Sequence, residues 1–212
     1  TELFANNLVT ILLTQSDKVI LSRMLTLEEF GYYMLAFTIT TMTLNVFSNS
    51  VSNVVFPTFT RLATAHKSDE LIANFHLSTR MMVWEAVSIG TMLVFFAREI
   101  LYVWAGNQSV ADRSATLLSL LAAAFTLNAI LMVPYYLQHA FGRSNLSFRF
   151  NLMALFLSIP GFIVGVYYYG AVGAGICWLI MQLVYFVTFV PAIRRSFLQF
   201  NLRDWYVADV GK

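Results

Sequence analysis

Charged residues are scarce in this sequence, and cysteine is almost absent. Asp, Glu, Lys and Arg make up 11% of the 212 residues, whereas about a quarter of a typical soluble domain is charged. The single cysteine, Cys177, excludes a disulfide framework and a cysteine-based metal site. The three histidines are far apart in the sequence and lack the spacing of metal ligands.

Apolar side chains take the place of the missing charge. Hydrophobic residues make up 58% of the chain, including 19 phenylalanines, which is more than a soluble core of this length needs. The composition therefore predicts an all-α polytopic membrane protein, in which each span needs about 20 mostly apolar residues. Six stretches meet this condition: 4–24, 29–63, 70–104, 111–141, 145–168 and 172–195.

Motifs of catalysis are missing as well. The sequence contains neither H-E-x-x-H nor G-x-S-x-G, and no glycine loop suited to phosphates. The basic residues are scattered without interleaved aromatics, so nucleic acid is not indicated. These absences favour a protein that is not an enzyme and that holds no organic cofactor.

The basic residues predict the orientation of the chain in the membrane. Loops on the cytoplasmic side carry an excess of Lys and Arg. The turns after the second and fourth stretches and the C-terminal tail, with their flanks, hold nine basic residues, whereas the other side holds three. We therefore expect the first set, and with six spans both termini of this segment, to be cytoplasmic. The first set is Arg61, Lys67, Arg80, Arg143, Arg149, Arg194, Arg195, Arg203 and Lys212; the second is Arg23, Arg98 and Arg113.

An acid and a base interrupt the first apolar stretch. Asp17 and Lys18 follow Thr14 and Gln15 in T-Q-S-D-K, and one charge at the centre of a bilayer costs about 2.5–3.5 kcal/mol even on the insertion scale. Two interpretations are open. Asp17 and Lys18 form a structural ion pair that positions the helix, or they line a watery cavity and contact a substrate or an ion.

A polar stripe in the second stretch supports the cavity. Its residues recur at intervals of three and four, which places them on one helical face. The alternative is that small polar side chains bond neighbouring helices together. The members of the stripe are Thr38, Thr41, Asn45, Asn49 and Ser52.

Six segments in order resemble a known family. They are D-K-V-I-L-S-R (17–23), L-E-E-F-G-Y-Y-M-L-A (27–36), V-V-F-P-T-F-T-R-L (54–62), E-I-L-Y-V-W-A-G (99–106), N-A-I-L-M-V-P-Y-Y-L-Q-H-A-F-G (128–142) and Y-G-A-V-G-A-G-I-C-W (169–178). The pattern resembles the second six-helix half of bacterial polysaccharide flippases, the O-antigen and lipid-linked-oligosaccharide exporters of the multidrug/oligosaccharidyl-lipid/polysaccharide superfamily.

The resemblance implies a transporter of the bacterial inner membrane that acts in polysaccharide or lipopolysaccharide biosynthesis. Such proteins have twelve or more helices in two lobes, and alternating access between the lobes flips a polyprenyl-pyrophosphate-linked oligosaccharide through a cationic cavity. We expect residues 1–212 to form one such lobe, as a fragment of a longer chain. The partners would be the lipid-linked oligosaccharide, the bilayer, and the missing N-terminal lobe or a second copy.

The resemblance also implies roles for individual residues. Asp17 matches a helix that carries a ligand for a coupling cation, Na⁺ or H⁺, in several relatives. Lys18 and Arg23 would meet the pyrophosphate. The remaining candidates for the cavity lining are Gln15, Thr41, Asn45, Asn49 and Ser52.

Three other functions compete with flipping. A drug/cation antiporter of the same superfamily would share the fold and the acid on the first helix. A membrane-bound glycan polymerase or ligase would be an enzyme, but it usually carries a large outward loop, and every outward turn predicted here is short. A purely structural subunit would use Asp17 and Lys18 only to pair with each other.

Overall fold

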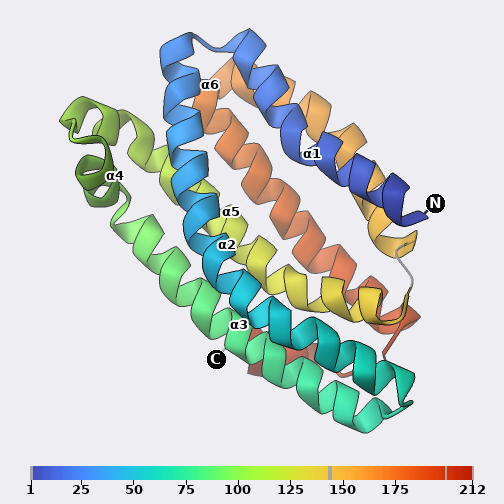
Figure 1. Cartoon of the computed structure of the whole chain (residues 1–212). Helices are drawn as coiled ribbons and strands as arrows, with labels where there is room; N and C mark the ends of the chain where they lie inside the picture. The colour runs from blue at the N-terminus through green and yellow to red at the C-terminus, as the bar shows by residue number, and fades with distance from the viewer. Residues whose placement is uncertain (1, 143–144, 199, 212) are drawn as a thin grey trace.

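The computed structural model describes residues 2–142, 145–198 and 200–211, with side chains from residue 9 onward apart from that of Phe47. Helices make up all the regular structure in this part of the chain (Figure 1), which confirms the expected all-α class. The long helices are α1 (Glu2–Met24), α2 (Leu27–Thr64), α3 (Ser68–Phe95), α5 (Gln108–Ala140) and α6 (Asn145–Ser196), and the short helix α4 (Ala97–Ala105) lies between α3 and α5. Two short elements, α7 (Leu202–Asp204) and η1 (Trp205–Val210), follow them.

Local capping defines two of the helix starts. The Thr26 hydroxyl accepts from the Glu29 backbone N–H, and the Glu29 carboxylate accepts from the Thr26 backbone N–H. This reciprocal pair satisfies two N–H groups that the first turn of α2 would otherwise leave free. Asn107 caps α5 in a similar way, through its bonds with the N–H groups of Ser109 and Val110.

The helix expected over 70–104 is divided in two. α3 and α4 meet at Phe96 with a bend of 75°, so the stretch 70–104 consists of two helices that together form one broken span or a re-entrant segment. Ala97 and Leu101 are buried in the cluster that includes residues of α5, and the bend allows that packing. Gly106, with a φ of 64°, then ends α4 in the left-handed conformation that glycine adopts at low cost.

Gly170 breaks α6 into two arms. Its φ of 58° and ψ of −144° are not helical, and they lie in a region that is essentially restricted to glycine. The arms then cross closely, since a Cβ on Gly173 would lie 1.9 Å from the Gly165 carbonyl oxygen. The two arms correspond to the stretches 145–168 and 172–195.

α5 lies centrally, between α2 and α3 on one side and α6 on the other (Figure 1). α1 packs along α6 and contacts α2 very little, so α1 and α2 diverge from their shared turn. One apolar cluster fills the end of the bundle near this turn and includes Leu21, Leu118 and Phe162. A second cluster fills the other end and includes Phe75 and Trp205.

The C-terminal segment folds back onto α3. Trp205 is fully buried, and its Nε1–H donates to the Thr79 hydroxyl at 3.1 Å. The buried Asp209 carboxylate pairs with His76 and lies 3.1 Å from Nε of Arg80. These contacts tie the end of the chain to the first half of α3.

In the described part of the chain, two helices, α5 and α6, are long and apolar enough to cross a membrane by length and composition. The bent pair α3 and α4 adds a third if it counts as one span. The count of six spans therefore stays a prediction. Two of the basic residues assigned to the cytoplasmic side, Arg143 and Lys212, lie outside the described residues.

Candidate functional site

Asp17 lies in a buried network that joins three helices. Its Oδ2 accepts from the Tyr33 hydroxyl at 2.5 Å and from Trp178 Nε1–H at 3.3 Å. The indole N–H also lies 3.1 Å from the Tyr33 oxygen, which accepts from it. Tyr33 belongs to α2 and Trp178 to the second arm of α6, so the carboxylate is held from two sides and has no exposed surface.

Lys18 sits at the edge of this network. Its Nζ donates to the Thr14 carbonyl at 2.9 Å, lies 3.5 Å from Asp17 Oδ1, and lies 4.1 Å from the centre of the Phe37 ring. An ammonium over an aromatic face is attracted by the negative face of the ring. The side chain remains 21% exposed, so its charge is held in one position and still reaches the surface.

Aromatic rings surround the pair. Trp178 lies 5.4 Å from Phe125 and 5.8 Å from Phe162 between ring centres, and Phe37 meets Phe125 edge to face at 5.5 Å. These rings exclude water from Asp17 and lower the local dielectric, which strengthens the bonds to the carboxylate.

Hydrogen-bond donors surround the Asp17 carboxylate in this conformation. The groups that face its oxygens are N–H and O–H donors, whereas Na⁺ needs oxygen atoms that donate electron pairs. Within the described residues, no three His, Cys, Asp or Glu side chains lie close enough together to hold a metal ion. The Asp17 carboxylate is thus held by donors in this conformation, and a coupling cation at Asp17 stays a prediction.

The other predicted residues of the first helix are open to the outside. Gln15 and Arg23 are exposed on α1, and Arg23 lies in its last turn. The structure therefore brings Asp17 and Lys18 together and leaves Gln15 and Arg23 on the surface.

The stripe on α2 is split between exposed and buried positions. Asn45 and Asn49 are exposed. Thr41 donates to the carbonyls of Phe37 and Thr38 within its own helix. Ser52 differs from the expectation, because it is buried and donates to the Ser48 carbonyl at 2.6 Å. Two amides thus remain as surface groups of the stripe.

A second polar contact joins α1 to both arms of α6. The Asn151 side-chain amide donates to the Thr10 hydroxyl at 3.1 Å, and the Tyr185 hydroxyl donates to the Asn151 carbonyl oxygen at 2.9 Å. Together with the Asp17 network, this contact fixes α1 against α6 at two levels.

Sequence reasoning did not find Tyr33 and Trp178. The available signal was the polar atom that each carries within an apolar stretch, because a buried Tyr O–H or Trp N–H usually finds a partner. Asp17 was the natural acceptor, but its partners lie 16 and 161 positions away along the chain.

Comparison with known proteins shows the family of the chain that carries this network. A family described as "Polysaccharide biosynthesis protein" matches residues 1–111, which include α1, α2 and the Asp17–Tyr33 bond. The chain belongs to this polysaccharide biosynthesis protein family. The resemblance to polysaccharide flippases found in the sequence is thereby confirmed.

One relative extends the similarity over nearly the whole chain. The protein is 25% identical over 210 residues to "Lipopolysaccharide biosynthesis protein WzxC" of Escherichia coli (strain K12), over 96% of this chain and 42% of the relative. The chain thus spans less than half the length of that polysaccharide biosynthesis protein. No solved structure matches.

Proposed function

We propose that the chain forms one lobe of a transporter that flips a polyprenyl-pyrophosphate-linked oligosaccharide across the bacterial inner membrane. Family membership and the similarity to a lipopolysaccharide biosynthesis protein support this assignment, and both favour a transporter over an enzyme. In the proposal the chain has six spans, both of its termini are cytoplasmic, and a second lobe completes the cavity. That lobe is supplied by the same chain, by a second copy or by another protein.

One observation carries the proposal: the ammonium of Lys18 on α1 is held in place and is still partly exposed. A pyrophosphate cannot cross about 30 Å of hydrocarbon without groups that replace its water. Lys18 supplies a positive charge, and Asp17 and Phe37 keep it in place. Arg23, near the end of the helix, supplies a second charge.

Exposed amides on α2 complement these charges. Asn45 and Asn49 can donate to and accept from sugar hydroxyls, and Gln15 on α1 adds a third amide. Because α1 and α2 diverge, the charges and the amides lie on two separate helices that share one turn (Figure 1). A second lobe that covers both helices would enclose a polar space for the head group and leave the lipid tail in the bilayer.

A substitution at Lys18 tests the proposal. Lys18→Ala removes the charge and leaves the Asp17–Tyr33–Trp178 bonds in place, so we expect export of surface polysaccharide to be lost at an unchanged level of membrane protein. Lys18→Arg should retain part of the export. Lys67→Ala is the matched control, because Lys67 is exposed in the turn before α3 and its ion pair there is with the exposed Glu70.

Two results would contradict the proposal. Normal export by Lys18→Ala would remove Lys18 from the transport path. Efflux of cationic drugs that depends on Asp17, with no effect on polysaccharide, would assign the chain to the antiporter branch.

A further inference from the structure

α4 is too short and too strongly bent to be part of a straight span. Nine residues of α-helix rise about 14 Å, against a hydrocarbon thickness of about 30 Å. The 75° bend at Phe96 turns α4 away from α3. If α3 crosses the membrane, α4 runs close to the membrane plane.

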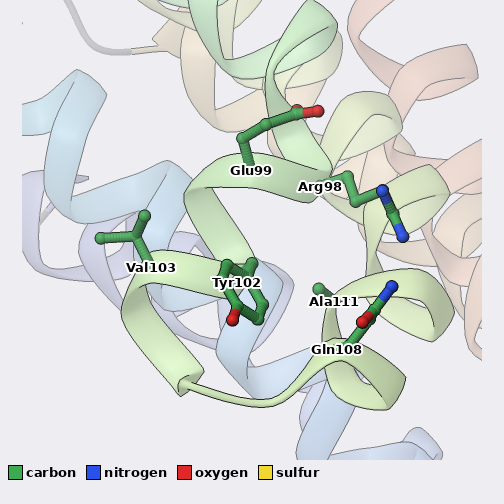
Figure 2. Close-up of a pocket in the computed structure, with 6 residues that line it drawn as sticks. All are labelled: Arg98, Glu99, Tyr102, Val103, Gln108 and Ala111. Atoms are coloured by element: carbon green, nitrogen blue, oxygen red, sulfur yellow. The ribbon is translucent and has the colours of Figure 1, made fainter.

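The sides of α4 differ in chemistry. Ala97 and Leu101 are buried in the bundle. Arg98 and Tyr102 line a groove of about 370 Å³ beside the start of α5, together with Gln108 (Figure 2).

Trp104 is 65% exposed. At 100° per residue, it points away from Arg98 and Tyr102 by more than a right angle. One edge of α4 therefore carries the Arg98 guanidinium and the Tyr102 hydroxyl, and the opposite edge presents an indole.

The apolar edge of α4 continues an apolar surface on α3. Met81, Trp84 and Met92 are exposed along one face of α3. Phe95 and Phe96 extend this surface into the bend, and both rings are exposed. An exposed apolar surface along an apolar helix is suited to contact with lipid, and α4 lies at the end of this surface.

Exposed tyrosines mark the same end of the bundle. Tyr167, Tyr168 and Tyr169 precede the break at Gly170 and are all exposed. The second arm of α6 meets the early part of α5 there, since Gly175 lies against Leu117. Tyr and Trp concentrate at the boundary between lipid and water. The tyrosines before Gly170 and Trp104 of α4 therefore mark one such boundary at this end of the bundle.

We propose that α4 is an interfacial helix that lies in the headgroup region of the bilayer, on the membrane face opposite the C-terminal segment. Trp104 and Phe96 enter the upper acyl region, and Arg98 and Glu99 stay in the hydrated layer. Arg98 is already paired with Asp112, so the partner is the lipid interface itself rather than one anionic lipid. The proposal depends on a membrane location and not on what the protein transports.

Fluorescence quenching in vesicles tests the depth of α4. Cys177→Ser first removes the native cysteine from the protein. A single cysteine is then introduced, as Trp104→Cys in one variant and as Glu99→Cys in another, and is labelled with bimane. Each labelled protein is reconstituted in phosphatidylcholine. The quenchers are a nitroxide near the top of the acyl chain, a nitroxide near its terminal methyl, and aqueous iodide.

We expect the label at Trp104→Cys to lose most fluorescence to the shallow nitroxide, because interfacial helices bury their apolar side about 5–10 Å below the headgroups. The label at Glu99→Cys should lose most to iodide. Leu157→Cys, exposed on the first arm of α6, is the control for lipid. Lys67→Cys, in the turn before α3, is the control for water.

Three outcomes would overturn the proposal. Quenching at Trp104→Cys by iodide as strong as at Lys67→Cys would place α4 in water. Quenching mainly by the deep nitroxide would place it inside the hydrocarbon. Protection from all three quenchers would mean that protein covers it. Phe95→Cys, at an exposed position beside the bend, repeats the measurement if Trp104→Cys does not fold.

Discussion

Tyr33→Phe removes a single hydroxyl from the Asp17 network. Tyr33 is fully buried, and its O–H donates to Asp17 Oδ2 at 2.5 Å. The phenyl ring keeps nearly all the volume, so packing changes little. A hydrogen bond to a charged group contributes about 1.5–3 kcal/mol, whereas an average interhelical bond in a membrane protein contributes about 0.6 kcal/mol. Because the acceptor is a carboxylate, we expect the higher range.

Reversible unfolding in mixed detergent micelles measures this cost, and a double-mutant cycle with Asp17→Asn isolates the pair. Asp17→Asn keeps an oxygen acceptor but removes its charge. The cost of Tyr33→Phe should then fall towards about 0.6 kcal/mol. Tyr168→Phe is the control, because Tyr168 is exposed and its change should stay within about 0.5 kcal/mol.

A cost of Tyr33→Phe that is small and equal in both backgrounds would refute the reasoning. It would show that the hydroxyl does not stabilise a charged Asp17. The Tyr33 bond would then contribute no more than an average interhelical bond, and the strength assigned here to the Asp17 network would be wrong.

Two further predictions concern the packing of α6 and the end of the chain. Gly173→Ala should cost more than about 3 kcal/mol and prevent accumulation in the membrane, because its Cβ would meet the backbone of Gly165; Gly31→Ala, with open space around it, should leave accumulation unchanged or increase it. Asp209→Asn should weaken the buried contacts of the C-terminal segment by about 1–3 kcal/mol, measured as faster amide exchange over 202–211. Equal accumulation of the two alanine variants, or unchanged exchange, would contradict these assignments.

Local chemistry made several helix ends predictable. The T-L-E-E sequence at Thr26 is a capping box that can be read without any tertiary contact, and it starts α2. Gly170 follows three tyrosines and precedes a second apolar stretch, and the structure breaks α6 there. In both places the residues that decide the geometry are neighbours in the chain.

The bend before α4 was not predictable in this way. Around Phe96 the sequence F-F-A-R-E has neither glycine nor proline, the usual causes of a kink. The bend accompanies the burial of Leu101 in the cluster that contains Leu118 of α5. A contact across the fold therefore overrides a local sequence that would continue as a helix.

Of the candidate site, the two charged residues could be predicted from the sequence and their aromatic partners could not. Asp17 and Lys18 stand out because charge is expensive in an apolar stretch. Tyr33 and Trp178 do not stand out, since aromatic residues are common throughout this chain. The contact of α1 with α6 shows that Trp178 meets the carboxylate, and the approach of α2 shows that Tyr33 does.

The network suggests why a buried carboxylate is kept at all. A buried charge pair is weak evidence for stability, because apolar residues of similar size often serve as well or better, while removal of one partner is costly. The Asp17 contacts therefore matter more for position: they set Lys18 relative to Tyr33 and Trp178. The Thr10–Asn151 contact holds the same helix to α6 farther along. α1 is thus held to α6 by both contacts and to α2 by Tyr33 and Phe37, so the position of Lys18 depends on the packing of all three helices.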